Sequence, residues 1–365
     1  MKIVEAVGKE KQKAFLAFRR KLYENKPCVD NSYFMIKEVF AGKMAFLRNV
    51  KCWPMMVMLE NKEVVCEGIL FYTPKLPEYM QIAFFESLGG SAEAVNLLFS
   101  EAERRGRKLG AKKLVAGLYG HVNYGLGFLS SHFDERNSFS SPYNPSYYDE
   151  IFRNGGFETI GLNTYIIPKI DDRLEKYRAK FTRMEKEFTY CTFQKRRFKY
   201  WSKIYTDLNN ECFKNHRYYY PREYDEDREM LKELFRFMKE DSVIFAFHNG
   251  EPVGFVMWYP DFNELAKPGE IFGPKHFFRK FGRTFKTGKL MEFGVCDAYK
   301  RTGLVLGLVD QAVTAMKKSG CITLESSWVL AENKASNNVC SGMCDSLYKE
   351  YSVYEKDIPE PDRGL

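Results

Sequence analysis

The stretch KLMEFGVCDAYKRTGLVLGLVDQAVTAMKK, from Lys289 to Lys318, sets the expectations for the rest of the chain. Its apolar first part predicts a strand over 290–296, and its basic, glycine-containing middle predicts a turn over 297–303. A strand that opens into a helix through glycine leaves backbone N–H groups unpaired at the positive end of the helix dipole, an arrangement that holds a diphosphate. The predicted helix rests on apolar residues at helical spacing, namely Leu304, Leu308, Val309, Ala312, Val313 and Met316.

Lys300 and Arg301 add two positive charges to this turn, where an anion would already meet partial positive charge. A plain surface turn between a strand and a helix has the same pattern, so both interpretations stay open. The sequence that follows predicts a second strand over 321–329 and a helix that opens at Ala331-Glu332-Asn333. A final strand is predicted over 347–355, so this half alternates strand, helix, strand, helix and strand.

This order of elements resembles the GNAT superfamily of acyl-CoA-dependent acyltransferases. The family signature is a strand with a valine near its end, then Arg/Gln-x-x-Gly-x-Gly/Ala, an amphipathic helix, a strand and an asparagine. The matching positions in this chain are Val295 for the strand valine, Lys300 for Arg/Gln, Gly303 for the first glycine, Val305 for the second small residue and Asn333 for the asparagine. Lys300 and Val305 depart from the signature, so the order of the elements carries more of the resemblance than the glycine turn does.

The resemblance implies that acetyl-CoA, or another acyl-CoA, is the co-substrate and that no metal takes part. It also implies that a backbone N–H near Phe293–Val295 polarises the thioester carbonyl and that the pantetheine pairs with this strand. The residues that it places around the cofactor are Phe293, Gly294, Val295, Lys300, Arg301, Thr302, Gly303, Leu304, Val305 and Asn333.

Direct transfer of the acyl group needs a base for the attacking amine and an acid for the departing thiolate. Glu292 lies on the predicted strand and is the candidate base, but the sequence leaves its face of the strand open, and a solvent-facing or structural glutamate has the same pattern. Family members often carry a tyrosine as the acid seven residues after the asparagine, and Cys340 stands there in this chain. Tyr348 and Tyr351 are the alternative donors, and a buried helical cysteine also has a purely structural explanation.

Two hairpin sequences indicate that the chain contains an internal duplication. VMLENKEVVCEGILFYTP spans 57–74 and FAFHNGEPVGFVMWYP spans 245–260, and each has strand, polar turn, Val, Gly, aromatic strand and Pro in the same order. Each is preceded by a helical segment and followed by a strand, a helix and a strand. We therefore predict an α/β (α+β) fold of two tandem GNAT-like domains, each with a mixed, mainly antiparallel sheet flanked by helices.

The predicted domains are a degenerate GNAT-like copy over 1–170, a charged helical connector over 171–188, an acyl-CoA-binding domain over 189–356 and a tail over 357–365. The first copy has Gly89-Gly90 before its helix but no Lys or Arg in that loop, so we expect it not to bind CoA. Its long loop is rich in Gly, Ser, Pro and Tyr. Three tyrosines of this segment either shape an acceptor pocket or the domain interface, or simply pack, namely Tyr143, Tyr147 and Tyr148.

The composition excludes several classes of protein. The five histidines lie far apart and the nine cysteines include no CxxC pair, so we expect reduced thiols in a cytoplasmic protein without a metal site. No run approaches the roughly 18 apolar residues of a membrane span, and the N-terminal segment lacks a signal-peptide core.

The net charge of +8 is partly concentrated just before the decisive strand. This segment is either a solvated surface loop or an attractive field for an anionic ligand such as CoA. A nucleic-acid surface ranks last, because no nucleic-acid motif accompanies the charge. The basic residues are Lys275, Arg279, Lys280, Arg283, Lys286 and Lys289.

Three functions remain compatible with the sequence. The first is an N-acyltransferase that moves an acetyl or other acyl group from acyl-CoA to a primary amine of a small-molecule or peptide acceptor. The second is a Fem-type aminoacyl transferase, which pairs two such domains but takes its acyl group from aminoacyl-tRNA. The third is a non-catalytic binding protein that retains the fold. We predict the first, because the 300–305 turn is a CoA-type feature; the acceptor, the acyl chain and the oligomeric state are not identified by the sequence.

Overall fold

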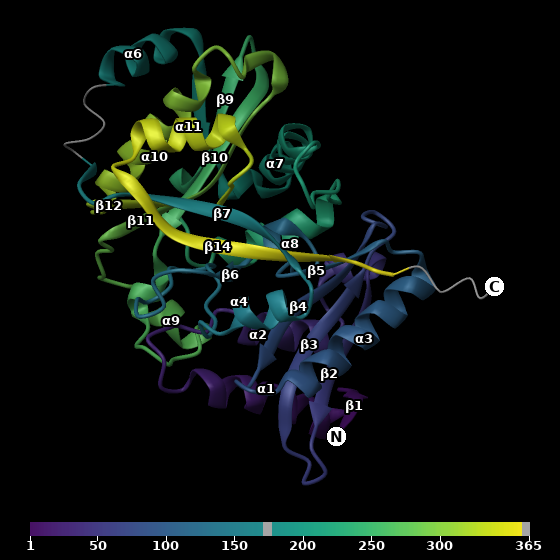
Figure 1. The fold of residues 1–365 in the computed structure, drawn as a ribbon. Helices are drawn as coiled ribbons and strands as arrows, with labels where there is room; N and C mark the ends of the chain where they lie inside the picture. The colour runs from purple at the N-terminus through teal and green to yellow at the C-terminus, as the bar shows by residue number, and fades with distance from the viewer. Residues whose placement is uncertain (171–176, 360–365) are drawn as a thin grey trace. The chain divides into compact units, whose positions relative to one another are not determined.

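A computed structural model describes residues 1–170 and 177–359 of the chain, and Figure 1 shows it as a ribbon. The chain forms two compact units, each with its own hydrophobic core. Unit 1 contains residues 1–162, 267–272 and the chain from Lys349 onward, and unit 2 contains residues 163–266 and 273–348.

Unit 1 is built on a mixed sheet that is antiparallel except between β4 and β5, as far as the described residues show. These two strands are parallel, so the chain crosses one face of the sheet between them as helix α3 (Ala92–Leu109). The strand order is β1 (Lys2–Glu5), β2 (Lys51–Met58), β3 (Val64–Tyr72), β4 (Tyr79–Ser87), β5 (Lys113–Ala116) and β14 (Ser346–Asp357), and the short β6 (Phe128–Leu129) pairs with β14.

Both faces of this sheet are covered, because successive strand residues point into two different cores. Leu70 of β3 and Ile82 of β4 pack in the cluster that contains α3, whereas their neighbours Ile69 and Ala83 pack in the cluster that contains α1. Every residue of β3 is buried in consequence. The helices beside α3 in unit 1 are α1 (Lys9–Tyr23), α2 (Tyr33–Phe40) and α4 (Tyr148–Asn154).

Unit 2 repeats this plan. Its parallel pair is β11–β12, joined by the crossover helix α10 (Leu304–Lys318), and its other described pairs are antiparallel. The strand order is β7 (Glu158–Ile167, with residues 163–167 in this unit), β12 (Thr323–Ser326), β11 (Thr287–Val295), β10 (Glu251–Pro260), β9 (Val243–His248) and β8 (Thr189–Thr192). The remaining elements are α6 (Arg178–Glu187), α7 (Phe198–Phe213), α8 (Tyr224–Leu234), α9 (Pro274–Arg279), β13 (Val329–Leu330) and α11 (Lys334–Met343).

The two faces of the unit 2 sheet also carry different helices. Val256 and Trp258 of β10 pack in the cluster that contains α10, whereas Phe255, the residue just before Val256, packs against Tyr205 of α7 with ring centroids 5.3 Å apart. The strand β11 lies beside β10 and leads into α10 through a short turn. The C-terminal end of β11 is therefore held next to the N-terminus of α10, with α7 on the other face.

Each unit is completed by a strand from the other half of the sequence. β7 lies at the end of the predicted first copy (1–170), but Ile167 pairs with Leu324 of β12 in unit 2. β14 lies at the end of the predicted second copy (189–356), but Tyr354 pairs with Ala116 of β5 in unit 1. The sequence copies and the compact units are therefore divided differently, and the boundaries that we gave for the copies stay a prediction.

The predicted fold class, a mixed sheet flanked by helices in each of two units, is confirmed. Both hairpins and both crossover helices form where the sequence placed them. Of the predicted connector, residues 171–176 lie outside the described residues, and α6 covers its second part. The strand β7 was missed: its sequence ETIGLNTYII follows a predicted loop, and its partner β12 lies more than a hundred residues away along the chain.

Substituting Tyr354 by alanine tests whether the C-terminal strand is integral to unit 1. Tyr354 is 1% exposed, stacks on Phe152 at 4.5 Å and donates a hydrogen bond to Asp149 at 2.9 Å. Tyr354→Ala should lower the free energy of unfolding by about 3–5 kcal/mol, because it leaves a cavity and an unpaired acceptor. Leu347→Ala on the same strand is the control: Leu347 is 46% exposed, so the change should stay within about 0.5 kcal/mol. Equal midpoints for both variants in denaturant would contradict the assignment of β14 to this core.

Candidate functional site

The strand β11 has one open edge. Its residues Thr287–Leu290 pair with β12, and Ser327 closes this pairing by donating its N–H to the carbonyl of Leu290 at 2.7 Å. Beyond that point β11 continues to Val295, paired only with β10 among the described residues. The backbone groups of residues 291–295 that face away from β10 can therefore pair with an extended ligand.

A β-bulge lies where this open edge begins. Met257 of β10 pairs with Glu292, and the next residue, Trp258, pairs with Leu290, so Met291 is the extra residue. A bulge interrupts the regular ladder and re-aims the neighbouring side chains. In this strand it sets the direction of Glu292 relative to the apolar residues before it.

The turn after β11 presents unpaired backbone donors. Gly303 adopts a left-handed conformation (φ 91°) at the N-cap of α10, which glycine accepts without strain. Thr302 accepts the N–H of Leu304 at 3.2 Å, but within the described residues the N–H groups of Arg301, Gly303 and Val305 meet no acceptor. Three such donors lie at the positive end of a helix dipole, an arrangement that suits an anion. The diphosphate site at this turn stays a prediction.

The two cations of the turn are not equivalent. The Lys300 ammonium lies 2.6 Å from the carboxylate of Asp297. Lys214, at the end of α7, approaches the same carboxylate at 3.5 Å. Arg301 is exposed and has no acidic partner in the part of the chain that the structure describes. Much of the charge of Lys300 is therefore compensated, and Arg301 is the cation that remains available to an anion.

Glu292 faces α7. Tyr205 donates its hydroxyl to one carboxylate oxygen, and Asn209, one helical turn later, donates its amide to the other at 3.1 Å. Burial raises the pKa of Glu292 to about 7, although both of these hydrogen bonds pull it down. A carboxylate that titrates near neutrality is suited to take a proton from an amine.

A second layer of hydrogen bonds fixes the orientation of Asn209. Tyr219 donates its hydroxyl to the side-chain oxygen of Asn209 at 3.0 Å, which leaves the amide nitrogen directed at Glu292. Nearby, Arg222 and Asp227 form an ion pair of 2.5 Å whose side chains are both fully buried. No sequence signal marked Tyr205 and Asn209 as partners of Glu292, because only the helical face of α7 relates them to a strand more than eighty residues away.

The remaining predicted residues lie on and beside α11. Asn333 caps this helix by accepting the N–H of Ser336 at 3.1 Å, so the family asparagine has at least a structural role. Cys340 is 2% exposed, and burial raises the pKa of its thiol to about 11, so it stays protonated at neutral pH. Tyr348 is half-buried on β14. The catalytic roles assigned to Cys340 and Tyr348 stay predictions.

The basic segment before β11 does not act as one charged surface. Lys289 is 2% exposed and lies 3.9 Å from the buried carboxylate of Glu325 on the neighbouring strand. Lys280 lies over the ring of Phe277 at 4.4 Å. These two residues therefore contribute little to a field for an anionic ligand. No group of three or more His, Cys, Asp or Glu side chains among the described residues is placed to hold a metal ion.

In unit 1 the corresponding strand edge is filled. The parallel pairing of β4 with β5 ends at Ile82, and β4 then continues to Ser87 beside β3. The N–H of Ser87 donates to the hydroxyl of Tyr148 at 2.9 Å, and Tyr147 donates its own hydroxyl to the carbonyl of Ser87 at 2.7 Å. These two tyrosines occupy the backbone groups of Ser87, the last residue of β4.

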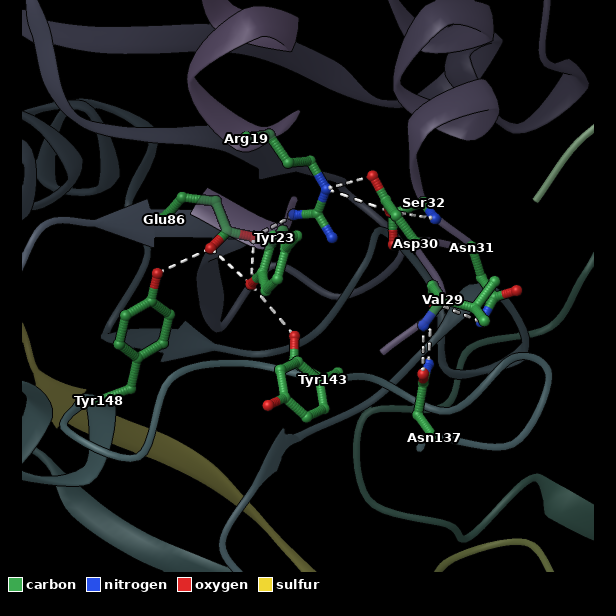
Figure 2. A network of polar contacts seen from close by, with 10 residues as sticks. All are labelled: Arg19, Tyr23, Val29, Asp30, Asn31, Ser32, Glu86, Asn137, Tyr143 and Tyr148. Carbon is green, nitrogen blue, oxygen red and sulfur yellow. Dashed lines mark hydrogen bonds and ion pairs between the residues drawn. The ribbon is translucent and has the colours of Figure 1, made fainter. Parts of the chain in front are cut away.

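Unit 1 nevertheless contains a polar network around a glutamate on the equivalent strand, and Figure 2 shows it. Glu86 accepts hydrogen bonds from the hydroxyls of Tyr23 and Tyr148, each at 2.7 Å, and contacts the guanidinium of Arg19. Arg19 also binds Asp30 at 3.2 Å. Burial raises the pKa of Glu86 to about 7. We did not predict this network; the charged residue in the otherwise apolar AFFES of β4 was the one sequence signal for it.

Comparison with known proteins agrees with this geometry. Residues 201–342 match the Acetyltransferase (GNAT) family. A tandem GNAT protein from the clavulanic acid biosynthesis pathway superposes with a TM-score of 0.55 at 11% identity, over 99% of this chain and 98% of that one. The chain has a tandem GNAT fold. A probable N-acyltransferase from Enterococcus faecalis V583 gives a TM-score of 0.52 at 10% identity, over 98% of this chain and 72% of that one.

Two curated proteins are more similar to this chain in sequence. Protein YghO of Escherichia coli (strain K12) is 24% identical over 272 residues, which are 72% of this chain and 70% of YghO. The bacterial ceramide synthase of Caulobacter vibrioides (strain NA1000 / CB15N) is 25% identical over 162 residues, which are 42% of each chain. The solved structures, at about a tenth identity, show the fold alone. Among the described residues, no helix of the tandem GNAT fold combines the length and apolarity of a bilayer span.

Replacing Tyr205 by phenylalanine tests the electrostatics of Glu292. The hydrogen bond from Tyr205 lowers the pKa of this carboxyl, so Tyr205→Phe should raise the pKa above about 7, by up to one unit. Carbon-13 NMR of glutamate-labelled protein measures it, with Glu292→Gln to assign the signal. Tyr200→Phe on the same helix is the control, because Tyr200 is exposed. An unchanged or lowered pKa in Tyr205→Phe would refute the hydrogen-bonded geometry.

Proposed function

We propose that this protein is an N-acyltransferase that moves an acetyl or other acyl group from acyl-CoA to a primary amine of a small-molecule or peptide acceptor. The observation that carries the proposal is the open edge of β11, which begins beside Glu292 and ends at the unpaired donors before α10. An extended pantetheine fits along a strand edge, and a diphosphate fits at the helix N-terminus. Both features lie in unit 2, within the residues that match the GNAT family.

In the proposed reaction, the amine nitrogen attacks the thioester carbonyl, and the C–S bond then breaks to release CoA as its thiolate. A backbone N–H of Phe293–Val295 stabilises the negative charge on the carbonyl oxygen. Glu292 takes the proton that the nitrogen loses, and an acid returns one to the sulfur. Cys340 and Tyr348 are the proposed acids, since a thiol and a phenol each carry a proton that can be donated.

One relative supports an amine acceptor. The Caulobacter protein is named a ceramide synthase, and a ceramide is the amide of a fatty acid with a long-chain amino alcohol. The alignment covers 42% of each chain, so the same acceptor for this protein is itself part of the proposal. A long-chain amino alcohol therefore belongs in the acceptor screen beside small amines and peptides. Acyl-CoA is made in the cytoplasm, and the nine cysteines are all unpaired, so we place the reaction in that compartment.

Calorimetric titration with acetyl-CoA tests the cofactor site. We expect one site per chain, and we expect Arg301→Ala to weaken binding several-fold at low salt, with a smaller loss at high salt. Lys300→Ala is the matched control, because its charge is already shared with Asp297 and its loss should matter less. A larger effect of Lys300→Ala would place the diphosphate elsewhere. Binding of aminoacyl-tRNA without acetyl-CoA would instead support the Fem-type alternative.

Turnover of acetyl-CoA with an accepted amine tests the role of Glu292. Because its pKa is raised to about 7, the carboxyl is protonated below this pH and cannot act as a base there. We expect kcat/KM to rise as the pH increases through about 7 and then to level off. Glu292→Gln should lower kcat by about 10²–10⁴-fold and leave acetyl-CoA affinity unchanged. Full activity in the variant would remove Glu292 from the mechanism without touching the CoA site.

A further inference from the structure

Unit 1 has a cavity that the proposed acyl transfer does not use. It encloses about 290 Å³, part of it open to solvent, and lies beside the network of Figure 2. Tyr23 lines this cavity and also donates to Glu86, so it connects the cavity with the buried carboxyl. The lining side chains come from three segments of the chain, namely the end of α1, residues 28–32 and the loop 137–143, with Tyr119 beside them.

Hydrogen bonds hold the walls of the cavity in place without a ligand. Asn137 accepts the N–H of Val29 at 2.9 Å and donates to its carbonyl at 3.2 Å, so the loop and the 28–32 segment are held together. Asp30 pairs through its own backbone with Glu270 and Phe272, at 2.9 Å each. Its carboxylate also accepts the N–H of Ser32 at 2.9 Å. A cavity with walls of this kind does not need to be ordered by its ligand.

Acceptors that lack a hydrogen-bond partner among the described residues lie in the cavity wall, at Asn31, and behind it, at Glu67, which does not line the cavity itself. Glu67 is 0% exposed, and neither of its carboxyl oxygens has a hydrogen-bond partner among the residues that the structure describes. It stands directly opposite Glu86 on the neighbouring antiparallel strand, so both side chains lie on the same face of the sheet. The side-chain oxygen of Asn31, in the cavity wall, is likewise buried without a partner in the described part of the chain. Buried acceptors of this kind are costly unless a donor reaches them.

The charged groups near the cavity also favour a cationic ligand over an anionic one. Three carboxyl groups, Asp30, Glu67 and Glu86, surround the guanidinium of Arg19, and their electrostatic fields act on one another. Arg19 is already engaged by both Asp30 and Glu86. An anionic ligand in the cavity would therefore meet a compensated cation and the Asp30 carboxylate. A cationic donor would meet Asp30 and the side-chain oxygen of Asn31, unpartnered within the described chain, with Glu86 behind Tyr23.

We propose that this cavity is a binding site for the protonated amino group of a small primary amine, with Tyr23, Tyr119 and Tyr143 as its aromatic walls. An ammonium group carries three N–H donors and favours the face of an aromatic ring. The site lies within unit 1 alone and does not depend on the proposed acyl-CoA site in unit 2.

Binding at this site is coupled to a proton. Glu86 does not line the cavity but accepts the hydroxyl of Tyr23, which does. Burial raises the pKa of Glu86 to about 7, so below this pH the ammonium enters with a neutral carboxyl behind Tyr23. The bound ammonium ion stabilises the ionised form of Glu86, which then releases one proton to the buffer. The positive charge of the ammonium that enters is balanced by the proton that leaves. The other titratable groups that face Glu86 and Glu67 are Arg19, Tyr23, Asp30, Tyr119, Tyr147 and Tyr148, with Cys28 beside Tyr23.

Calorimetric titration of the full chain with ethanolamine, against ethylene glycol as the uncharged analogue, tests the proposal. We expect ethanolamine to bind and ethylene glycol not to bind. The affinity should fall by about tenfold from pH 8 to pH 6, because most of the Glu86 carboxylate becomes protonated over that range. At pH 6 the enthalpy should also depend on the ionisation enthalpy of the buffer, which reports the released proton.

Glu86→Gln and Glu292→Gln form a matched pair of variants. The side-chain amide of Glu86→Gln retains an oxygen for Tyr23 and Tyr148 but has no charge, so we expect ethanolamine affinity at pH 8 to fall by at least about tenfold and the proton release to vanish. Glu292→Gln should bind ethanolamine as the wild type does. Equal binding of ethylene glycol, stronger binding of acetate, or loss of binding in Glu292→Gln alone would overturn the proposal. The pH dependence in the wild type decides it even if Glu86→Gln unfolds.

Discussion

The end of the parallel pairing between β11 and β12 is the constraint on which the second unit depends. Pairing stops at Leu290, but β11 continues to Val295 because β10 supports its other edge. Among the described residues the strand is thus ordered and yet unpaired on one side, which is rare because unpaired backbone groups are costly. The bulge at Met291, the direction of Glu292 and the donors before α10 all follow from this arrangement. The open strand edge gives the pantetheine part of the acyl-CoA proposal a physical basis besides the altered glycine turn.

The two units place a glutamate in comparable surroundings. Glu86 and Glu292 each lie on the strand before a crossover helix, each accepts a tyrosine hydroxyl from the first long helix of its unit's sequence copy, and burial raises each pKa to about 7. The supporting groups differ: Asn209 donates to Glu292, whereas the guanidinium of Arg19 contacts Glu86. A neutral amide leaves the carboxylate available as a base, and a guanidinium ties it into a charge network. The same strand position therefore serves proton transfer in one proposal and ligand binding in the other.

The first copy differs from the second in two ways: its loop at Gly89-Gly90 has no basic residue, and side chains occupy the end of β4. Tyr147 and Tyr148 satisfy the backbone of Ser87, and Tyr148 also packs in an aromatic cluster with Phe85 and Phe152. Once aromatic side chains fill the edge, basic residues in the loop at Gly89-Gly90 would have no cofactor to hold. The expectation that this copy does not bind CoA thus acquires a steric reason. Of the three tyrosines singled out in the sequence, Tyr148 is a core residue, and Tyr143 lines the cavity of unit 1.

The local elements of this protein follow from its sequence. The apolar periodicity of α10, the Asn-Gly hairpin, the strand–turn–helix at 290–318 and the cap at Asn333 each depend on a few neighbouring residues, whose preferences the sequence states directly. The side of β11 on which Glu292 lies does not follow from the sequence. The bulge at Met291 interrupts the alternation of side chains from which that side would be predicted. Nor does the position of β7 and β14 in the opposite units, or the network of Arg19 with Glu86, follow from the sequence. Each of these joins groups that only the folded chain brings together, and burial, which raises the pKa values of both glutamates, is a property of the packed core and not of the residues themselves.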